Sequence, residues 1–180
     1  RPEQPSDEVL LGKAAGGDAG SLAELVARHR DRLWRLCLRL ERESHEAEDL
    51  FQETFVRLIR SYRSFSGRGR FFTWLYAIAL NTYRSRRRSA LRGWKFEAEY
   101  GREKVAEGAA EGAERAEAAE LVREAVNSLP EPQRSAIILS RYEGLSYQQI
   151  AEIEHCTEDA VKQRVRRAME RLREALKDLE

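Results

Sequence analysis

Apolar residues in the first half of the chain recur in steps of three and four, the spacing that places side chains on one buried face of a helix. After a disordered tail at residues 1–6, a short helix is predicted that Asp7 caps and that ends near Gly16. A longer helix is predicted to start after Ser21. Its apolar stripe consists of Leu22, Leu25, Val26, His29, Leu33, Leu36, Cys37 and Leu40.

Two further helices complete the first bundle. One is predicted over residues 44–62, and its stripe consists of Ala47, Leu50, Phe51, Phe55, Leu58, Ile59 and Tyr62. Residues 63–70 are rich in Ser, Gly and Arg, which predicts a loop. The next helix is predicted over residues 71–88, with an inner side formed by Phe71, Trp74, Leu75, Ile78, Ala79 and Thr82. Together these helices predict one domain at residues 1–96.

Residues 97–120 have a different composition. They repeat Glu, Ala and Gly, and they carry no apolar side chain larger than Ala between Val105 and Leu121. Because such a segment cannot bury enough apolar surface to order itself, we expect a flexible linker. Its Glu and Ala content leaves a helix toward Leu121 as the alternative.

Residues 121–180 predict a second helical domain. Its first helix starts at Leu121 and is expected to stop at Pro130 and Pro132. Another helix is predicted over residues 135–142. The fold class is therefore all-α, with two small helical domains joined by a linker.

A helix-turn-helix pattern follows in this second domain. Ser146 and Gln149 have the spacing of a capping box, which opens a short helix ending near Glu154. Residues 155–156 form the turn, and Thr157 is a suitable cap for the last helix. Two helices split by a short turn are typical of a DNA-binding helix-turn-helix.

The last helix is amphipathic. Its apolar side carries Ala160, Val161, Val165, Ala168 and Leu172. Its outward side is basic and polar, with Lys162, Gln163, Arg164, Arg166, Arg167, Arg171 and Arg173. In a helix-turn-helix the second helix enters the major groove, where Arg, Lys and Gln can contact base edges. The alternative is a cationic helix that docks only on protein.

Composition narrows the function classes. The 180 residues are 42% hydrophobic and 35% charged, and the longest apolar runs are only a few residues, which excludes a transmembrane span and a signal-peptide core. Cys37 and Cys156 lie far apart without metal-ligand spacing, which argues against a disulfide scaffold and a zinc finger. We expect no cofactor and no metal, in a protein of the cytoplasm.

Charge is distributed unevenly. Residues 1–96 carry 19 basic and 12 acidic side chains, residues 97–120 carry 3 and 8, and residues 121–180 carry 10 and 11. No acidic residue lies between Glu53 and Glu97, a stretch that holds eleven basic residues and ten of the fifteen aromatics. Such a surface attracts phosphates, and aromatic faces can stack on unpaired bases. A solvated basic face over an aromatic core is the alternative, but the length of the acid-free stretch favours nucleic-acid contact.

Asp49, Gln52 and Glu53 form a polar patch at i, i+3 and i+4. A carboxylate metal or acid–base site, a solvated face and a protein-docking face all fit this pattern. Because no His or further acid is placed to complete a metal set, we expect no catalytic residue here.

Four motifs occur in order along the chain: DLFQETF at 49–55, FTWLYAIALN at 72–81, LPEPQR at 129–134 and GLSYQQIA at 144–151. Together they resemble an extracytoplasmic-function (group IV) sigma factor of bacterial RNA polymerase, over nearly the whole chain. The resemblance implies two helical domains, sigma-2 and sigma-4. It also implies three partners: the polymerase core with its β′ and β subunits, promoter DNA, and an anti-sigma factor.

The resemblance also assigns roles to residues. The surface that binds the clamp helices of β′ would consist of Asp49, Gln52, Glu53 and Arg57. The loop at 63–70 would capture a base flipped from the non-template strand of the −10 element, with Phe65 and Asn81 in the pocket. The residues assigned to this strand are Arg63, Phe65, Arg68, Arg70, Asn81, Arg84, Arg87 and Arg88. Trp74 belongs either to the core, which we favour, or to this DNA surface.

In the second domain the resemblance assigns the −35 element to the last helix. Lys162, Gln163, Arg166 and Arg167 match base-reading positions, and Arg164 and Arg171 would face the DNA backbone. Relatives often carry a Gly-Thr or Gly-Ser pair where this chain has Asp159-Ala160, so one hydroxyl contact to phosphate is missing.

Two other functions remain to be compared with this one. A free-standing helix-turn-helix regulator would need a dimer interface, and it would leave the acid-free aromatic segment unexplained. A nucleic-acid enzyme would use Asp49 and Glu53 to bind a divalent metal.

Overall fold

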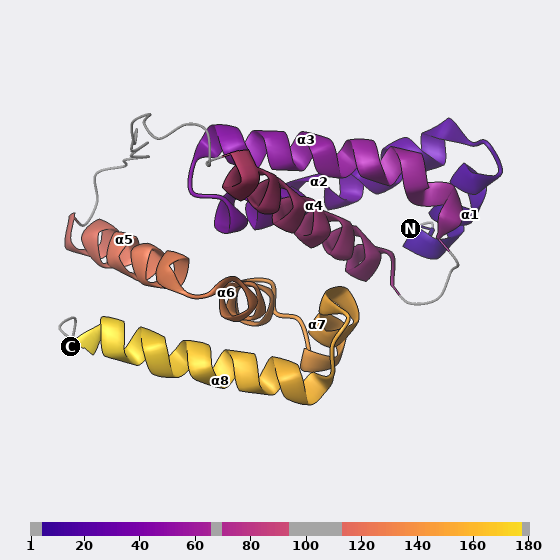
Figure 1. Cartoon of the computed structure of the whole chain (residues 1–180). Coiled ribbons are helices and arrows are strands. Elements are labelled where there is room, and N and C mark those ends of the chain that lie inside the picture. Colours follow the sequence, from indigo (N-terminus) through magenta and orange to yellow (C-terminus); the bar gives the residue numbers. More distant parts are fainter. Residues whose placement is uncertain (1–4, 66–69, 94–112, 178–180) are drawn as a thin grey trace. The chain divides into compact units, whose positions relative to one another are not determined.

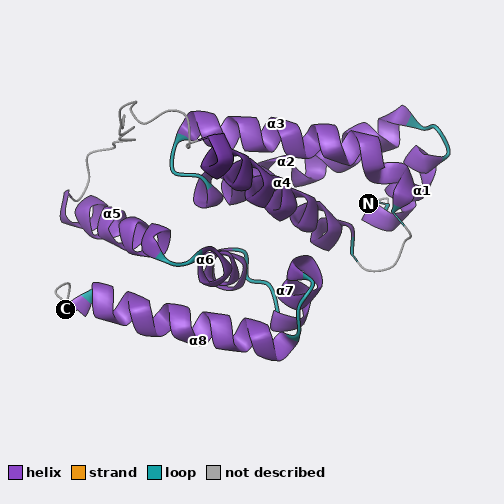
Figure 2. Cartoon of the chain, viewed as in Figure 1, coloured by secondary structure: helices purple, strands orange, loops and turns teal. Residues whose placement is uncertain are grey.

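The computed structural model describes residues 5–65, 70–93 and 113–177, and all regular elements in these ranges are helical, which confirms the all-α prediction (Figures 1 and 2). The chain divides into two compact units, Arg1–Arg102 and Glu103–Glu180. The linker expected at 97–120 lies largely outside the described residues. The first unit contains α1 (Asp7–Ala15), α2 (Ala19–Leu40), α3 (Ser44–Ser61), a 3₁₀ turn (Tyr62–Ser64) and α4 (Phe71–Gly93).

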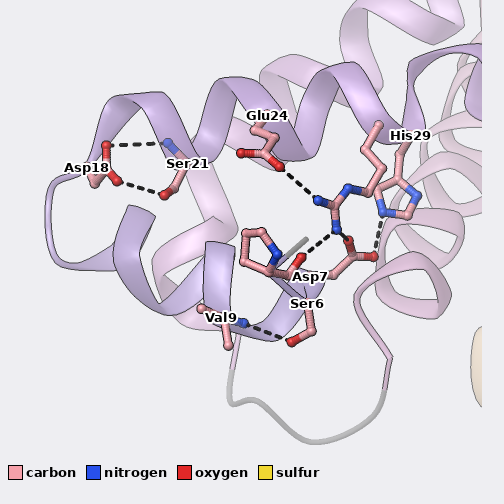
Figure 3. Close-up of polar contacts among 9 residues, drawn as sticks. Ser6, Asp7, Val9, Asp18, Ser21, Glu24 and His29 are labelled. Atoms are coloured by element: carbon pink, nitrogen blue, oxygen red, sulfur yellow. Dashed lines mark hydrogen bonds and ion pairs between the residues drawn. The ribbon is translucent and has the colours of Figure 1, made fainter. Parts of the chain in front are cut away.

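The N-terminal helix α1 is capped by Ser6, whose Oγ accepts a hydrogen bond from the Val9 N–H at 3.3 Å (Figure 3). The expectation that Asp7 is the cap is therefore wrong. Asp7 is the first helical residue and holds α1 against α2. Its Oδ1 accepts from Arg28 Nη1 at 2.8 Å, and its Oδ2 lies 2.6 Å from His29 Nε2 (Figure 3).

The turn between α1 and α2 explains where α1 ends and where α2 begins. Gly17 adopts φ +103, a left-handed conformation that favours glycine. Asp18 then caps α2 by accepting from the Gly20 N–H at 3.0 Å and the Ser21 Oγ at 2.7 Å, and the Ser21 bond lowers the pKa of Asp18. This Asp cap starts α2 at Ala19, earlier than the apolar stripe indicates.

The core of the first unit lies between α2, α3 and α4, and α4 contacts both of the others. Because α4 is covered on two sides, it buries Tyr76, Leu80 and Tyr83 in addition to four positions of the predicted stripe, Phe71, Leu75, Ala79 and Thr82. The other two, Trp74 and Ile78, are half-buried. Its helix extends beyond the predicted end, to Gly93. The fully buried leucines of this core are Leu25, Leu33, Leu36, Leu40, Leu50, Leu58, Leu75 and Leu80.

The second unit contains α5 (Ala113–Ser128), α6 (Glu131–Ile137), a π-helical turn (Ile138–Tyr142), α7 (Tyr147–Glu154) and α8 (Glu158–Ala175). Two of its helices begin earlier than predicted. The helix expected from Leu121 starts at Ala113, within the segment assigned to the linker. The helix expected from residue 135 starts at Glu131, with Pro132 in its first turn. Backbone N–H groups of the first turn have no partner within the helix, so a proline, which lacks this group, is tolerated there.

The core of this unit gathers side chains from all of its helices. Its buried apolar residues are Ala125, Val126, Leu129, Ala136, Ile137, Ile138, Leu139, Leu145, Ile150, Ile153, Val161, Val165 and Ala168. Three of them, Val161, Val165 and Ala168, belong to the predicted apolar side of α8. Among the residues that the structure describes, no helix is long and apolar enough to cross a bilayer.

Candidate polymerase and nucleic-acid surfaces

The patch predicted on α3 faces outward. The Asp49 side chain is 63% exposed. Gln52 Nε2 donates to Glu48 Oε1 at 3.2 Å, and Glu53 Oε1 accepts from Arg57 at 2.7 Å (Nη2) and 3.1 Å (Nε). These contacts are spaced at i, i+4, so they run along the helix and hold the polar groups on one face.

The same face of α3 continues with apolar side chains. Val56 is 44% exposed and Ile59 is 53% exposed, so the expectation that Ile59 is buried is wrong. Thr54 is buried in the core instead, where its Oγ1 donates to the Leu50 carbonyl at 2.7 Å. A threonine hydroxyl that donates to a carbonyl of its own helix can be buried without an unsatisfied polar group. The pattern of apolar residues does not include this polar residue, so it did not predict that Thr54 is buried. Polar groups beside exposed apolar ones are typical of a protein-docking surface.

Behind this patch lies Arg86 of α4. Its guanidinium is 3.5 Å from Asp49 Oδ2, 3.8 Å from Glu53 Oε2 and 3.9 Å from Glu41 Oε1. The Glu41 side chain, at the C-terminus of α2, is only 6% exposed. The three carboxylates come from α2 and α3, so Arg86 connects all three core helices of the first unit.

Aromatic rings gather at the start of α4, beside the loop. The Phe65 ring lies 5.1 Å from Trp74 and 6.4 Å from Phe71, and His29 lies 5.2 Å from Phe71, as ring centroids. Phe71 is buried, whereas Phe65 and Trp74 are half-buried. Trp74 therefore supports Phe65 from the edge of the core. Residues 66–69, with the candidate Arg68, lie outside the described residues.

The basic residues of α4 separate into two faces. At about 100° per residue, Asn81, Arg84, Arg87 and Arg88 share one face, and Arg86 lies roughly 200° around the helix from Arg84. Asn81, Arg87 and Arg88 are exposed, and Arg84 is half-buried. Arg87 lies over the Tyr83 ring at 5.7 Å. The exposed Arg70 begins this surface, and Arg63 lies over the Tyr62 ring at 5.7 Å.

The helix-turn-helix of the second unit forms as predicted. Ser146 Oγ accepts from the Gln149 N–H at 3.2 Å, and Gln149 Oε1 accepts from the Ser146 N–H at 2.9 Å, which is a complete capping box. His155 occupies the turn in the left-handed region, at φ 52. Thr157 caps α8 by accepting from the Ala160 N–H at 3.2 Å. These local bonds fix the angle at which α8 leaves the turn.

The outward face of α8 carries five of the residues assigned to the −35 element, all exposed: Lys162, Gln163, Arg166, Arg167 and Arg171. Arg166 Nη2 donates to Gln163 Oε1 at 3.0 Å. A hydrogen bond to Asp159 raises the pKa of Lys162. This face can present several donors to base edges and phosphates at once.

Arg164 lies in a different environment from its neighbours. It donates to Glu154 Oε2, and its Nη1 lies 3.5 Å from Cys156 Sγ. The Glu154 side chain is 0% exposed, and its Oε1 accepts from Ser135 Oγ at 2.6 Å. In this structure Arg164 therefore neutralises a buried carboxylate that the sequence analysis did not identify.

No group of three or more His, Cys, Asp or Glu residues within the described ranges is arranged to hold a metal ion. Cys37 is buried in the core, and burial, with the nearby Glu41 carboxylate, raises its pKa to about 12. The patch on α3 and the basic faces of α4 and α8 suit the binding of other macromolecules.

Comparison with known proteins decides between the functions considered. The family model "Sigma-70 region 2" matches residues 25–93, and "Sigma-70, region 4" matches residues 119–172. The RNA polymerase sigma-H factor of Pseudomonas aeruginosa is 33% identical, over 98% of this chain and 96% of the relative. The ECF RNA polymerase sigma-E factor of Escherichia coli is 34% identical, over 93% of each.

The chain belongs to the ECF family of RNA polymerase sigma factors.

Solved structures agree with this assignment. CnrH, in complex with the cytosolic domain of CnrY, matches with a TM-score of 0.72 and 26% identity, over 98% of this chain and 99% of that chain. The sigma factor RpoE of Bartonella quintana, in complex with the anti-sigma factor NepR, matches with a TM-score of 0.69 and 28% identity, over 87% of this chain and 96% of that chain.

Membership of this family settles the function at a coarse level. The protein is an alternative sigma factor, a transcription initiation factor that directs RNA polymerase to promoters, and it is not an enzyme. The alternative of a free-standing helix-turn-helix regulator is wrong, because the similarity to sigma factors extends over both units. The enzyme hypothesis for Asp49 and Glu53 is dropped on the same evidence.

Proposed function

We propose that this sigma factor uses three separate surfaces during initiation. The outward face of α3 binds the polymerase, the loop and basic face of α4 open the −10 element, and α8 reads the −35 duplex. One observation carries the proposal: two basic surfaces of different character lie on one chain, one beside clustered aromatics and the other on a recognition helix.

The polymerase surface consists of Asp49, Gln52, Glu53 and Arg57. Of the two acids on this surface, Asp49 is more exposed than Glu53. Val56 and Ile59 add exposed apolar area to the same face of α3. A carboxylate on the same helix face as exposed apolar side chains suits the clamp helices of β′, because a cation and a hydrophobic side chain could both be buried on that face.

The −10 surface combines stacking with phosphate binding. Flipping a base out of the stack costs a few kcal/mol, so the protein must supply compensating contacts. Phe65, supported by Trp74, offers a partly exposed aromatic face, and Asn81 offers a donor and an acceptor from an exposed position. The phosphates on either side would be held by Arg63, Arg68, Arg70, Arg84, Arg87 and Arg88.

The −35 surface consists of Lys162, Gln163, Arg166 and Arg167 on α8, with Arg171 toward the DNA backbone. Arg164 was assigned to the backbone as well. To reach a phosphate it would have to leave Glu154, so we now place it in the support of the recognition helix.

Several wider features complete the proposal. The domains are sigma-2 at 1–96, a linker at 97–120 whose last residues form the start of α5, and sigma-4 at 121–180. The protein acts in the cytoplasm. An anti-sigma factor holds it inactive, which is supported by the solved complex of RpoE with NepR.

Phe65→Ala and Arg167→Ala test these surfaces together. In holoenzyme, Phe65→Ala should lower permanganate-detected opening of the −10 element about tenfold, since base stacking contributes about 1–3 kcal/mol, and leave −35 binding unchanged. Arg167→Ala should weaken binding to −35 duplex by about tenfold with less effect on opening of a pre-melted template. Equal loss of both activities in either variant would contradict the assignment.

A further inference from the structure

Arg86 lies on a different face of α4 from Arg84 and Arg88, and its guanidinium faces protein acids. It is offset from Asn81 and Arg84 by roughly 140–160° around the helix, measured the shorter way at about 100° per residue. Its side chain is 29% exposed, and its guanidinium lies within 3.5–3.9 Å of three carboxylates. The basic run in the sequence therefore includes a residue whose guanidinium faces three protein carboxylates.

Each guanidinium nitrogen of Arg86 faces a different carboxylate. Arg86 Nη2 faces Asp49 Oδ2, Nη1 faces Glu53 Oε2, and Nε faces Glu41 Oε1. Glu53 Oε1 is held from the other side by Arg57. The two acids of the polymerase surface are thus approached from behind, while the 63%-exposed Asp49 projects to solvent.

We propose that Arg86 is a positioning residue for polymerase binding, which orders Asp49 and Glu53 on α3, and that it is not a DNA phosphate contact. A planar guanidinium holds its donors in a fixed fork, so its three nitrogens can each orient a different carboxylate, whereas an ammonium is a compact point charge with freely rotating donors. Ordering side chains before binding reduces the entropy lost on binding. The inference rests on the proposed role of Asp49 and Glu53.

Charge alone predicts the opposite effect. Removing Arg86 makes the surface more acidic, which would strengthen attraction to a cationic partner. Positioning predicts weaker binding. The sign of the effect therefore separates the two explanations.

The test measures the affinity of full-length, fluorescently labelled sigma factor for core RNA polymerase. Arg86→Ala should weaken binding about tenfold, and Arg86→Lys should restore only part of it. Arg30→Ala, which removes one exposed positive charge from α2, serves as the charge-matched control and should leave the affinity within about twofold. Thermal melts of each variant show whether it is folded at the assay temperature.

A double-mutant cycle shows whether Arg86 acts through the acid. Asp49→Asn alone should weaken binding, and adding Arg86→Ala to it should then weaken binding by less than about threefold. If Asp49→Asn has no effect, the proposed polymerase surface itself fails. If Asp49→Asn weakens binding while Arg86→Ala leaves it unchanged or tighter, only the inference about Arg86 is overturned. Reduced binding of −10 single strand by Arg86→Ala holoenzyme, at unchanged polymerase affinity, would make Arg86 a phosphate contact.

Discussion

Arg164 and Arg166 lie two residues apart on α8 but have different environments. Arg164 is paired with the buried Glu154, whereas Arg166 is exposed and lies 3.8 Å from the exposed Glu170. Periodicity places both near the basic side of the helix, and only the three-dimensional position of Glu154 distinguishes them. The carboxylate was not identifiable from the sequence, because an acid at the end of a polar helix is ordinarily solvated.

We expect Arg164→Ala to destabilise the second unit by about 3 kcal/mol, because it removes the guanidinium that pairs with the buried Glu154 carboxylate. Arg166→Ala should change stability by less than about 0.5 kcal/mol, since surface ion pairs contribute little. Urea unfolding followed by circular dichroism measures both. Equal stability of the two variants would show that Glu154 is neutralised in some other way.

Cys37 should be chemically inert in the folded protein. Burial and Glu41 raise its pKa to about 12, so almost no thiolate forms at pH 8, while Cys156 is half-exposed in the turn. Iodoacetamide at pH 8 should therefore modify Cys156 first and Cys37 only after unfolding in urea. Peptide mass spectrometry measures the order, and faster labelling of Cys37 would contradict its position in the core.

The same shift predicts how alkali affects stability. Below the ordinary thiol pKa of 9.0, both the folded and the unfolded state keep the proton on Cys37. Above that value the unfolded state loses it and the folded state does not, so this contribution to stability falls as the pH rises toward 12. Cys37→Ala should show a smaller loss of stability between pH 9 and 11 than the unaltered chain.

At the scale of the elements, the capping box of α7 fixes the start of the helix-turn-helix. Ser146→Ala removes one of its two reciprocal bonds and should destabilise the second unit by about 1 kcal/mol. Ser146→Asp, which keeps an acceptor at the cap, should retain most of the stability. Hydrogen exchange at the amides of the first turn of α7 measures the effect locally, and an unchanged exchange rate in Ser146→Ala would show that the cap does not hold this end.

Most helices were predictable because their signals are local. The capping box at Ser146, the cap at Thr157 and the apolar side of α8 depend only on nearby residues, and the structure confirms all three. The stripes of α2 and α4 were predictable for the same reason. Such signals identify where a helix exists better than where it begins.

The boundaries that differed have physical causes. α6 starts at Glu131 because proline is favoured in the first turn of a helix. From the sequence, Pro132 was expected only to end the preceding helix. α5 starts at Ala113 because the Ala and Glu residues there have high helix propensity without any apolar stripe to show it.

The candidate surfaces were predictable to a different extent. The exposure of Asp49, Lys162 and Arg167 follows from their position off the apolar stripes. The pairing of Arg86 with acids of two other helices and the support of Phe65 by Trp74 depend on packing between elements. Contacts of that kind leave no periodic signal in a sequence.

At the scale of the molecule, we propose that the two compact units divide promoter recognition between them. Each unit carries its own basic surface, and the two are joined through a segment of net negative charge. Linking two DNA-binding modules makes the second contact effectively intramolecular, so modest affinity in each unit is sufficient for specific binding. An acidic connection is also repelled by the DNA that the basic surfaces bind.

The most direct test of the account is in vitro transcription with purified protein, bacterial core polymerase and a library of promoter fragments, with sequencing of the new 5′ ends. We expect specific starts that share two upstream elements, one recognised by each unit. These starts should be lost in a Phe65→Ala, Arg167→Ala double variant that still binds core polymerase. Absence of specific starts, together with no measurable binding to core polymerase, would contradict the account.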